Sequence, residues 1–249
     1  MFNVKDKHVL ITGAASGIGL GLAEHFATQG ATVSTVDISE KNPNPSLGLN
    51  HFKADVSNSE ELHSAFESAV KRNGVLDVVI NNAGIAIEEG AIENADISIL
   101  EKVLNINVKG VYLGIQNAAK YLTDGGSIIN TGSLAASVTF PEYCTYSISK
   151  SSVIQMTKNA ALQLGNRKIR VNSVSPGTVL TPMEAESGDE ARISKTCTAL
   201  ERPADISDLI GIYHFLASDA SRYITGIDVK VDGGWSAGVT NKALACLLD

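Results

Sequence analysis

Short apolar runs alternate with longer amphipathic stretches along the whole chain. Runs of four to eight residues with β-branched and aliphatic side chains predict strands. Seven such runs occur, at His8–Thr12, Thr32–Asp37, His51–Val56, Leu76–Asn81, Ser127–Thr131, Ile169–Ser175 and Ile227–Val231. Several are apolar without interruption, as in Val78–Ile80. Uninterrupted apolar strands are typical of parallel sheets that helices cover on both faces.

Helical periodicity fills most of the intervals between these strands. The predicted helices are Gly19–Thr28, 57–74, Ile97–Leu122, Tyr146–Leu164 and Ala204–Ala217. Ser57 and Glu60 predict a capping box for the second of them. Ile97–Leu122 reads as one long helix, apolar nearly all round and therefore packed on two sides. Two prolines and a glycine interrupt residues 39–50, so this crossover is expected to be mostly loop.

Alternation of strand and helix predicts an α/β fold with right-handed crossovers. We expect a doubly wound, Rossmann-type parallel sheet of seven strands with helices on both faces. No linker or shift in composition divides the chain, so residues 1–249 are predicted to form a single domain.

Composition and charge narrow the functional classes. The chain has 249 residues, 44% of them hydrophobic and 19% charged, which suits a packed globular protein. A net charge of −7 argues against nucleic acid or an anionic membrane as the main partner. Cys144, Cys197 and Cys246 are widely spaced and form no metal-binding or redox pair, so no metal is expected. We find no leader sequence and no bilayer-spanning apolar run, and expect a cytoplasmic protein.

A glycine-rich turn follows the first strand, over Thr12–Gly19. Gly13 permits a tight turn, Gly17 lets the backbone approach a pyrophosphate, and Gly19 allows close packing of helix on strand. The following helix presents free N–H groups and the positive end of its dipole to phosphates. The turn therefore predicts a dinucleotide site, with Ser16 and Ile18 among its contacts.

Asp37 ends the second strand, 24 residues after Gly13. A carboxylate at that place accepts hydrogen bonds from the adenosine ribose and repels a 2′-phosphate. Ala15 in the glycine-rich turn provides no basic partner for such a phosphate. Both positions favour NAD over NADP.

Tyr146 and Lys150 lie four residues apart in a predicted helix and so share one face. Ser133 follows the fifth strand, at the carboxyl edge where α/β sheets bind ligands. Hydride transfer to or from an alcohol carbon must be matched by proton transfer at its oxygen. A free tyrosine, with a pKa of about 10, is a poor base at neutral pH, and a neighbouring ammonium group favours the phenolate. The three residues therefore predict an acid/base site for alcohol–ketone interconversion.

The chain resembles the short-chain dehydrogenase/reductase family, in its branch of single-domain members with about 250 residues. The resemblance covers nearly the whole chain. Its motifs are Thr12–Gly19, Asp55, Asn81–Gly84, Asn107–Gly110, Ser133, Tyr146–Lys150, Pro176–Gly177 with Thr181, and Val231–Gly234.

The resemblance implies a role for each matching residue. Tyr146 would be the acid/base, Ser133 would orient the substrate, and Lys150 would bind the nicotinamide ribose. Asn107 would hold a water in a proton relay with Lys150. Further cofactor contacts are implied at Asp55, Val56, Asn82, Ala83, Gly84, Pro176, Gly177, Val179 and Thr181. Many relatives are homotetramers, so a homo-oligomer, dimer or tetramer, is expected, with the helices near 97–122 and 146–164 at its interface.

Other activities stay open at this point. A 3-oxoacyl reductase of the same family would usually carry a basic residue in the glycine-rich turn, where this chain has Ala15. An enoyl reductase would space its tyrosine and lysine more widely. A catalytically silent NAD-binding regulator is the alternative from another class. We expect a small alcohol or ketone as substrate, in a pocket lined by Leu134, Phe140, Tyr143, Val179 and Met183 and covered by a polar, mobile lid over Met183–Glu201.

Overall fold

Seven parallel strands form one sheet in the order β3-β2-β1-β4-β5-β6-β7. The computed structural model describes residues 2–180 and 189–248. Its strands are β1 (His8–Thr12), β2 (Thr32–Asp37), β3 (Asn50–Lys53), β4 (Leu76–Asn81), β5 (Leu122–Thr131), β6 (Arg170–Pro176) and β7 (Asp228–Val231). The predicted fold class is confirmed, because every strand pair is parallel and helices cover both faces.

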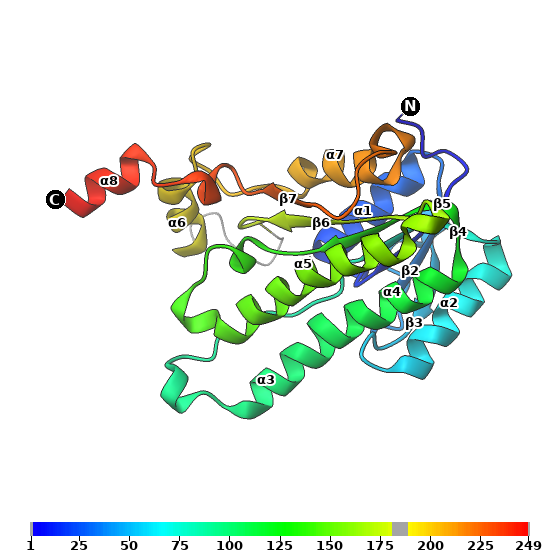
Figure 1. The fold of residues 1–249 in the computed structure, drawn as a ribbon, viewed down its shortest axis with the longest axis horizontal. Helices are drawn as coiled ribbons and strands as arrows, with labels where there is room; N and C mark the ends of the chain where they lie inside the picture. The colour runs from blue at the N-terminus through cyan, green and yellow to red at the C-terminus, as the bar shows by residue number, and fades with distance from the viewer. Residues whose placement is uncertain (1, 181–188, 249) are drawn as a thin grey trace.

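Helices pack on the two faces of this sheet (Figure 1). On one face, α1 (Gly17–Thr28) packs against α7 (Ile206–Ala217). On the other lie α2 (Ser59–Asn73), α4 (Gly110–Tyr121) and α5 (Cys144–Leu164). The remaining helices are α3 (Ile97–Leu104), which leads toward α4, and α6 (Asp189–Cys197) and α8 (Asn241–Leu248). The last of these ends the described chain and contacts α6 (Figure 1).

The core is divided into two layers by the sheet. Successive residues of β1 point to opposite faces, because side chains alternate along a strand. Leu10 packs in the layer under α2, α4 and α5. Val9 and Ile11 pack in the layer under α1 and α7, and all three side chains are fully buried. This burial on both faces explains the uninterrupted apolar strands in the sequence.

The predicted helix at 97–122 is helical throughout 97–121, but it is not a regular α-helix and it ends one residue earlier than predicted. A π-helical segment, Asn105–Lys109, separates α3 from α4, and Leu122 already belongs to β5. Asn107 is completely buried within the π-helical segment. Its side chain hydrogen-bonds both backbone groups of Ile85, a contact with a distant part of the chain that helical periodicity does not reveal.

The predicted third strand and the following cap also differ from the structure. The strand ends at Lys53, not at Val56. Asn58, not Ser57, caps α2, and its side chain accepts hydrogen bonds from the backbone of Glu60 and Glu61. Ser57 instead donates both its N–H and its hydroxyl to Asp55. The second crossover contains only a 3₁₀ turn, Pro45–Leu47, as its prolines predict.

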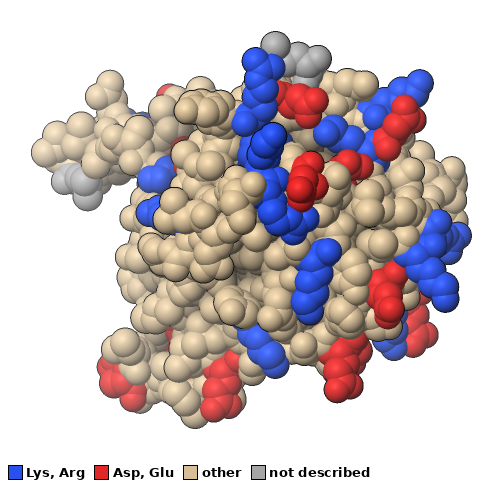
Figure 2. All heavy atoms as spheres, turned by 45° about the vertical axis from the view of Figure 1, so that its right-hand side comes forward, with Lys and Arg blue, Asp and Glu red and all other residues tan. Residues whose placement is uncertain are grey.

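Two short helices, α6 and α8, escaped prediction. The first lies within the segment that we expected to be a mobile lid. Among the residues described, no helix combines the length and the hydropathy that crossing a bilayer requires. On the face drawn in Figure 2, acidic and basic side chains are interspersed rather than gathered by sign.

Candidate active site

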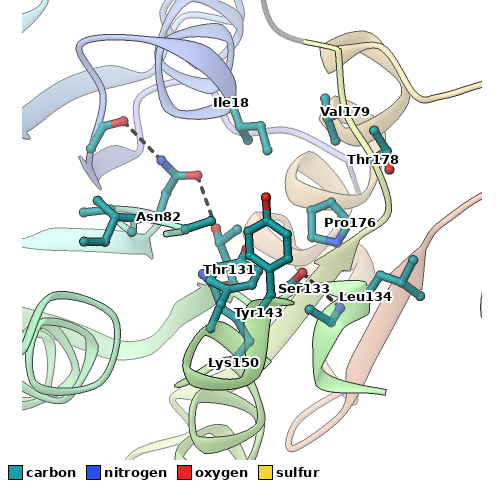
Figure 3. Close-up of a pocket in the computed structure, with 18 of the residues that line it drawn as sticks. Ile18, Asn82, Thr131, Ser133, Leu134, Tyr143, Lys150, Pro176, Thr178 and Val179 are labelled. Carbon is teal, nitrogen blue, oxygen red and sulfur yellow. Dashed lines mark hydrogen bonds between the residues drawn. The ribbon is translucent and has the colours of Figure 1, made fainter. Parts of the chain in front are cut away.

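A cavity of about 1000 Å³ opens at the carboxyl ends of the strands. It extends from the glycine-rich turn between β1 and α1 to the first turns of α5. Figure 3 shows its centre, with Ile18 and Asn82 on one side, Pro176 and Val179 on the other, and Lys150 below. Parallel sheets of this type bind ligands at this edge.

The glycine-rich turn leaves no room for side chains at two positions. Gly13 has φ +65°, and a Cβ added to it would lie 2.6 Å from the Cα of Ala83. A Cβ on Gly19 would lie 2.1 Å from the carbonyl oxygen of Gly13. Gly13 lines the cavity together with Ser16 and Ile18, whereas Gly17 and Gly19 shape the turn without lining it.

Two carboxylates line the end of the cavity beside β2 and β3, Asp37 and Asp55. The Asp37 carboxylate accepts from the N–H of Ala15 at 3.0 Å and from the N–H of Ser39 at 3.0 Å. Each oxygen thus has one backbone donor and keeps lone pairs for a ligand. Val56 and Ile38 line the same end, and Ile38, which is 70% exposed, was not predicted.

Asn82 ties three strands together beneath the cavity. Its Nδ2 donates to the carbonyl oxygens of Thr12, at 3.2 Å, and Gly13, at 3.1 Å. Its Oδ1 accepts from the Thr131 hydroxyl at 3.4 Å (Figure 3). The side chain therefore holds the ends of β1, β4 and β5 in register. Ala83 and Gly84, which follow it, both line the cavity.

Ser133, Tyr146 and Lys150 meet in this cavity. Lys150 Nζ donates to the carbonyl oxygen of Thr131 at 2.9 Å and lies 5.7 Å from the centre of the Tyr146 ring. Ser133 Oγ accepts from the N–H of Ala135 at 3.1 Å. Helix α5 thus presents the tyrosine and the lysine to the end of β5, where the serine follows.

Burial controls the protonation of both ionisable groups. It raises the pKa of the Tyr146 phenol, against a hydrogen bond with Ser133 that lowers it, and the charge of Glu190 raises it further. Burial also lowers the pKa of Lys150 to about 8. We expected Lys150 to lower the pKa of the tyrosine, but burial of the phenol raises it instead, because loss of hydration disfavours the charged form.

Asn107 lies behind the cavity rather than in its lining. Its Nδ2 donates to the carbonyl oxygen of Ile85 at 2.8 Å and to Ser149 Oγ at 3.0 Å. A Cβ on Gly84 would lie 3.2 Å from Asn107 Oδ1 and 3.3 Å from Lys150 Nζ. The amide and the ammonium group therefore converge on the same glycine.

The remaining predicted lining residues lie at the end of β6 and in the segment between β5 and α5. Pro176, Gly177 and Val179 line the cavity, and so do Leu134, Phe140 and Tyr143. Thr181 and Met183 lie outside the described residues. The lining side chains that prediction missed include four carboxylates and a tryptophan, at positions that no motif marks: Glu88, Glu142, Asp189, Glu190 and Trp235. Within residues 2–180 and 189–248, no group of three or more His, Cys, Asp or Glu side chains has the arrangement of a metal site.

Known proteins with similar sequences and folds identify the family. A sequence profile described as enoyl-(acyl carrier protein) reductase matches residues 13–236. Trans-4-hydroxycyclohexanecarboxylate dehydrogenase of Sinomonas cyclohexanicum is 37% identical over 250 residues, which cover 94% of this chain and 95% of that protein.

Solved structures agree with these sequence matches. A short-chain dehydrogenase/reductase from Serratia marcescens BCRC 10948 has a TM-score of 0.89 at 32% identity, covering 94% of this chain and 99% of that one. A blue fluorescent protein from a metagenomic library, in complex with NADPH, has a TM-score of 0.87 at 32% identity, with coverage of 94% and 99%. The chain therefore belongs to the short-chain dehydrogenase/reductase family, whose members are oxidoreductases that bind a nicotinamide cofactor.

Proposed function

We propose that the protein interconverts a secondary alcohol and its ketone with NAD(H), using Tyr146 as acid/base. The observation that carries the proposal is the convergence of Ser133, Tyr146 and Lys150 in the cavity that also holds the glycine-rich turn. A proton-transferring phenol and a dinucleotide cradle in one cavity suit hydride transfer at an alcohol carbon.

The residues present fit a dinucleotide. The backbone of Gly13 lies so close to Ala83 that a side chain at position 13 would fill the space at the glycine-rich turn. From there the cavity reaches Asp37 at one end and Tyr146 at the other, as an extended ligand requires. When bound, the nicotinamide ring supplies the hydride exchange. Ser16 and Ile18 would contact the pyrophosphate, with the N-terminus of α1 beside it.

Asp37 supports NAD rather than NADP as the cofactor. Its carboxylate is held toward the glycine-rich turn by the N–H of Ala15, at the place where an adenosine ribose would lie. A 2′-phosphate there would face this charge without a basic partner among the described lining residues nearby, since Lys150 is at the other end. On this proposal the chain differs in its cofactor from the metagenomic blue fluorescent protein, whose structure contains NADPH.

The chain's own residues perform the proton transfer. Ser133 Oγ donates to the substrate oxygen and holds it beside the Tyr146 oxygen. As phenolate, Tyr146 takes the proton from the alcohol, and as phenol it returns the proton to the oxygen of the ketone. Lys150, whose pKa burial lowers to about 8, carries a positive charge at neutral pH, and this charge favours the phenolate of Tyr146. Asn107 would hold an ordered water that relays protons between Lys150 and solvent.

The second proposal concerns assembly. Tyr112 on α4 is 59% exposed, and Ile148 and Leu162 on α5 are 47% and 85% exposed. Apolar side chains on two adjacent helices suit a contact between copies of this chain. Sedimentation as a dimer or tetramer would support this assembly, and a monomer would exclude it.

The activity is tested by absorbance of reduced nicotinamide. NAD and NADP are compared, with a panel of secondary alcohols and their ketones, for the wild type and Tyr146→Phe. Turnover with NAD that is lost in Tyr146→Phe, while NAD still binds, is the expected result. Equal turnover in the two proteins would contradict the role of Tyr146. Binding of NAD without turnover of any compound would favour a regulator.

A further inference from the structure

The end of the cavity that contains Tyr146, where the substrate would bind, is called the substrate end. It carries an excess of negative charge. Glu88, Glu142, Asp189 and Glu190 line it, and Lys150 is the one basic side chain among the lining residues that the structure describes. Lys150 is buried, and its Nζ donates to the carbonyl oxygen of Thr131. Nothing in the described lining therefore offers an exposed cation to an anionic substrate.

Three separate elements bring these carboxylates to the cavity. The N–H of Glu89 donates to the carbonyl oxygen of Glu142 at 3.0 Å, so the segment after β4 lies against the 3₁₀ turn Pro141–Tyr143. Glu88 and Glu142 belong to these two segments. The third element is α6, whose Glu190 is close enough to act electrostatically on the Tyr146 phenol.

Arg192 pairs with Asp189 at 2.9 Å, but both side chains are largely exposed and Arg192 does not line the cavity. Glu88, Glu142 and Glu190 contribute three further carboxylates to the described lining of the substrate end. Their field acts on any charged group that enters, although solvent screens it because each is exposed.

Aromatic rings line the cavity together with these carboxylates. We call the four carboxylates and the rings of Phe140, Tyr143 and Trp235 the wall of the substrate end. Phe140 and Trp235 both line the cavity and pack edge to face, with ring centres 5.6 Å apart and planes at 90°. Tyr143 lines it between Glu142 and α5. Aromatic faces beside carboxylates are the surroundings that stabilise an organic ammonium group, through cation–π and ionic attraction together.

We propose that this wall selects alcohols and ketones that carry an ammonium group over those that carry a carboxylate or a phosphate. The inference rests on the proposed alcohol–ketone activity and specifies its substrate class. It also distinguishes this chain from the Sinomonas relative, whose name specifies a carboxylate substrate. Acyl thioesters of phosphate-bearing carriers are disfavoured for the same reason.

Three alcohols of one ring type provide the test. They are trans-4-aminocyclohexanol, trans-4-methylcyclohexanol and trans-4-hydroxycyclohexanecarboxylate, which are cationic, neutral and anionic at pH 7. We expect kcat/KM to fall in that order, with about tenfold between the amine and the carboxylate, as a few exposed ionic contacts would give. In about 0.5 M NaCl this ratio should shrink toward one, because salt screens exposed charges.

Charge-neutral variants assign the selectivity to this wall. Glu142→Gln and Glu190→Gln should each lower the amine-to-carboxylate ratio. Glu67→Gln, on the exposed surface of α2 and outside the cavity lining, is the matched control and should leave the ratio as in the wild type. Using the ratio within each variant cancels changes in Tyr146 that affect all three alcohols equally.

Binding is measured independently through Trp235, the single tryptophan of the chain. Its fluorescence is titrated with each alcohol in the absence of NAD, and the amine should act at the lowest concentration. If no alcohol turns over but the amine binds best, the wall is as proposed and the alcohol–ketone activity is wrong. Turnover without preference for the amine, in kcat/KM and in binding, would overturn the inference and leave the activity standing. Neither turnover nor preferential binding would overturn both.

Discussion

The carboxylate of Glu89 accepts hydrogen bonds from both the backbone N–H and the hydroxyl of Thr145, the residue before Tyr146. Helix α5 begins at Cys144, and its N-cap residue, Tyr143, does not cap it with its side chain. A residue from the segment after β4 therefore caps the helix that carries Tyr146 and Lys150. The negative charge also complements the helix dipole at that end.

Replacing Glu89 by Ala should loosen the first turn of α5 and displace the tyrosine hydroxyl. We expect kcat to fall by roughly tenfold to a hundredfold, because small misplacements of reacting groups are costly. The KM for NAD should change little, since the glycine-rich turn is distant in the fold. Loss of the cap should lower the free energy of unfolding by about 1 kcal/mol.

Rates measured across pH separate positioning from general instability. Glu89→Gln retains one acceptor oxygen and should recover part of kcat, and the apparent pKa in the pH–rate profile should shift in Glu89→Ala. Glu101→Ala, at an exposed position of α3, is the control. A loss of stability with unchanged kcat would show that Glu89 only caps the helix.

Asp37 should govern the choice between the two nicotinamide cofactors. Asp37→Asn keeps an oxygen that can accept from the N–H of Ala15 but removes the negative charge. The ratio of kcat/KM for NAD to that for NADP should fall by about tenfold or more, as expected when charge repulsion near a surface is relieved. Steady-state rates with both cofactors measure it, and an unchanged ratio would rule out the assigned role.

His8 should make stability depend on pH. Its side chain is 3% exposed, with Nδ1 donating to the Gly74 carbonyl oxygen and Nε2 accepting from the Ser34 hydroxyl. Burial lowers the pKa of His8 below 6.5, although hydrogen bonds to Gly74 and Val75 and the charge of Asp77 oppose this. The unfolded chain therefore binds more protons in the window below pH 6.5, and the free energy of unfolding falls as pH decreases through it.

Thermal unfolding between pH 7.5 and 5 tests this dependence. The melting temperature of the wild type should decrease below about pH 6.5, the ordinary pKa of histidine. His8→Gln, which cannot titrate, should show a shallower decrease. His25, whose pKa is also lowered by burial and by the nearby His214, acts in the same direction, so some dependence should remain. Identical slopes in the two proteins would exclude His8 as a contributor.

Gly114 should tolerate no side chain. A Cβ there would lie 2.0 Å from Asn81 Oδ1, in the buried layer between α4 and β4. Asn81 Nδ2 donates to Asn130 Oδ1 at 2.8 Å, and Asn130 Nδ2 donates to the Thr157 hydroxyl at 2.9 Å. Gly114→Ala should therefore force this polar chain apart and cost about 1–3 kcal/mol.

Chemical denaturation compares this variant with Gly165→Ala. Gly165 has no atom within 4 Å of an added Cβ and has φ −61°, so alanine there should be neutral or slightly stabilising. Similar stabilities for the two variants would mean that α4 shifts easily to admit the methyl group.

The central strands were predictable because packing and sequence pattern agree there. β1, β2 and β4 have the predicted bounds, since their apolar residues fill both layers of the core. The glycine-rich turn and the position of Ser133 after β5 followed from the same strand ends. The resemblance to a family placed Tyr146 and Lys150 in a common site, which their spacing alone does not establish.

Other features depend on contacts between distant segments. The π-helical segment forms where Asn107 reaches Ile85 and Ser149, and apolar periodicity contains no sign of these bonds. Glu89 was not predicted, because a cap from another element leaves no local motif. The carboxylates of the substrate end come from three loops and helices, so their convergence becomes visible only in the folded chain.

The lining of the cavity extends from Gly13 to Trp235, across nearly the whole sequence. No short fragment contains both ends of it, and the strands that carry it are joined only when β1 has paired with both β2 and β4. Binding of a ligand that spans the cavity is therefore coupled to global folding rather than to local ordering. A saturating cofactor should raise the unfolding free energy of the entire chain by RT ln(1 + [L]/Kd), in a single cooperative transition.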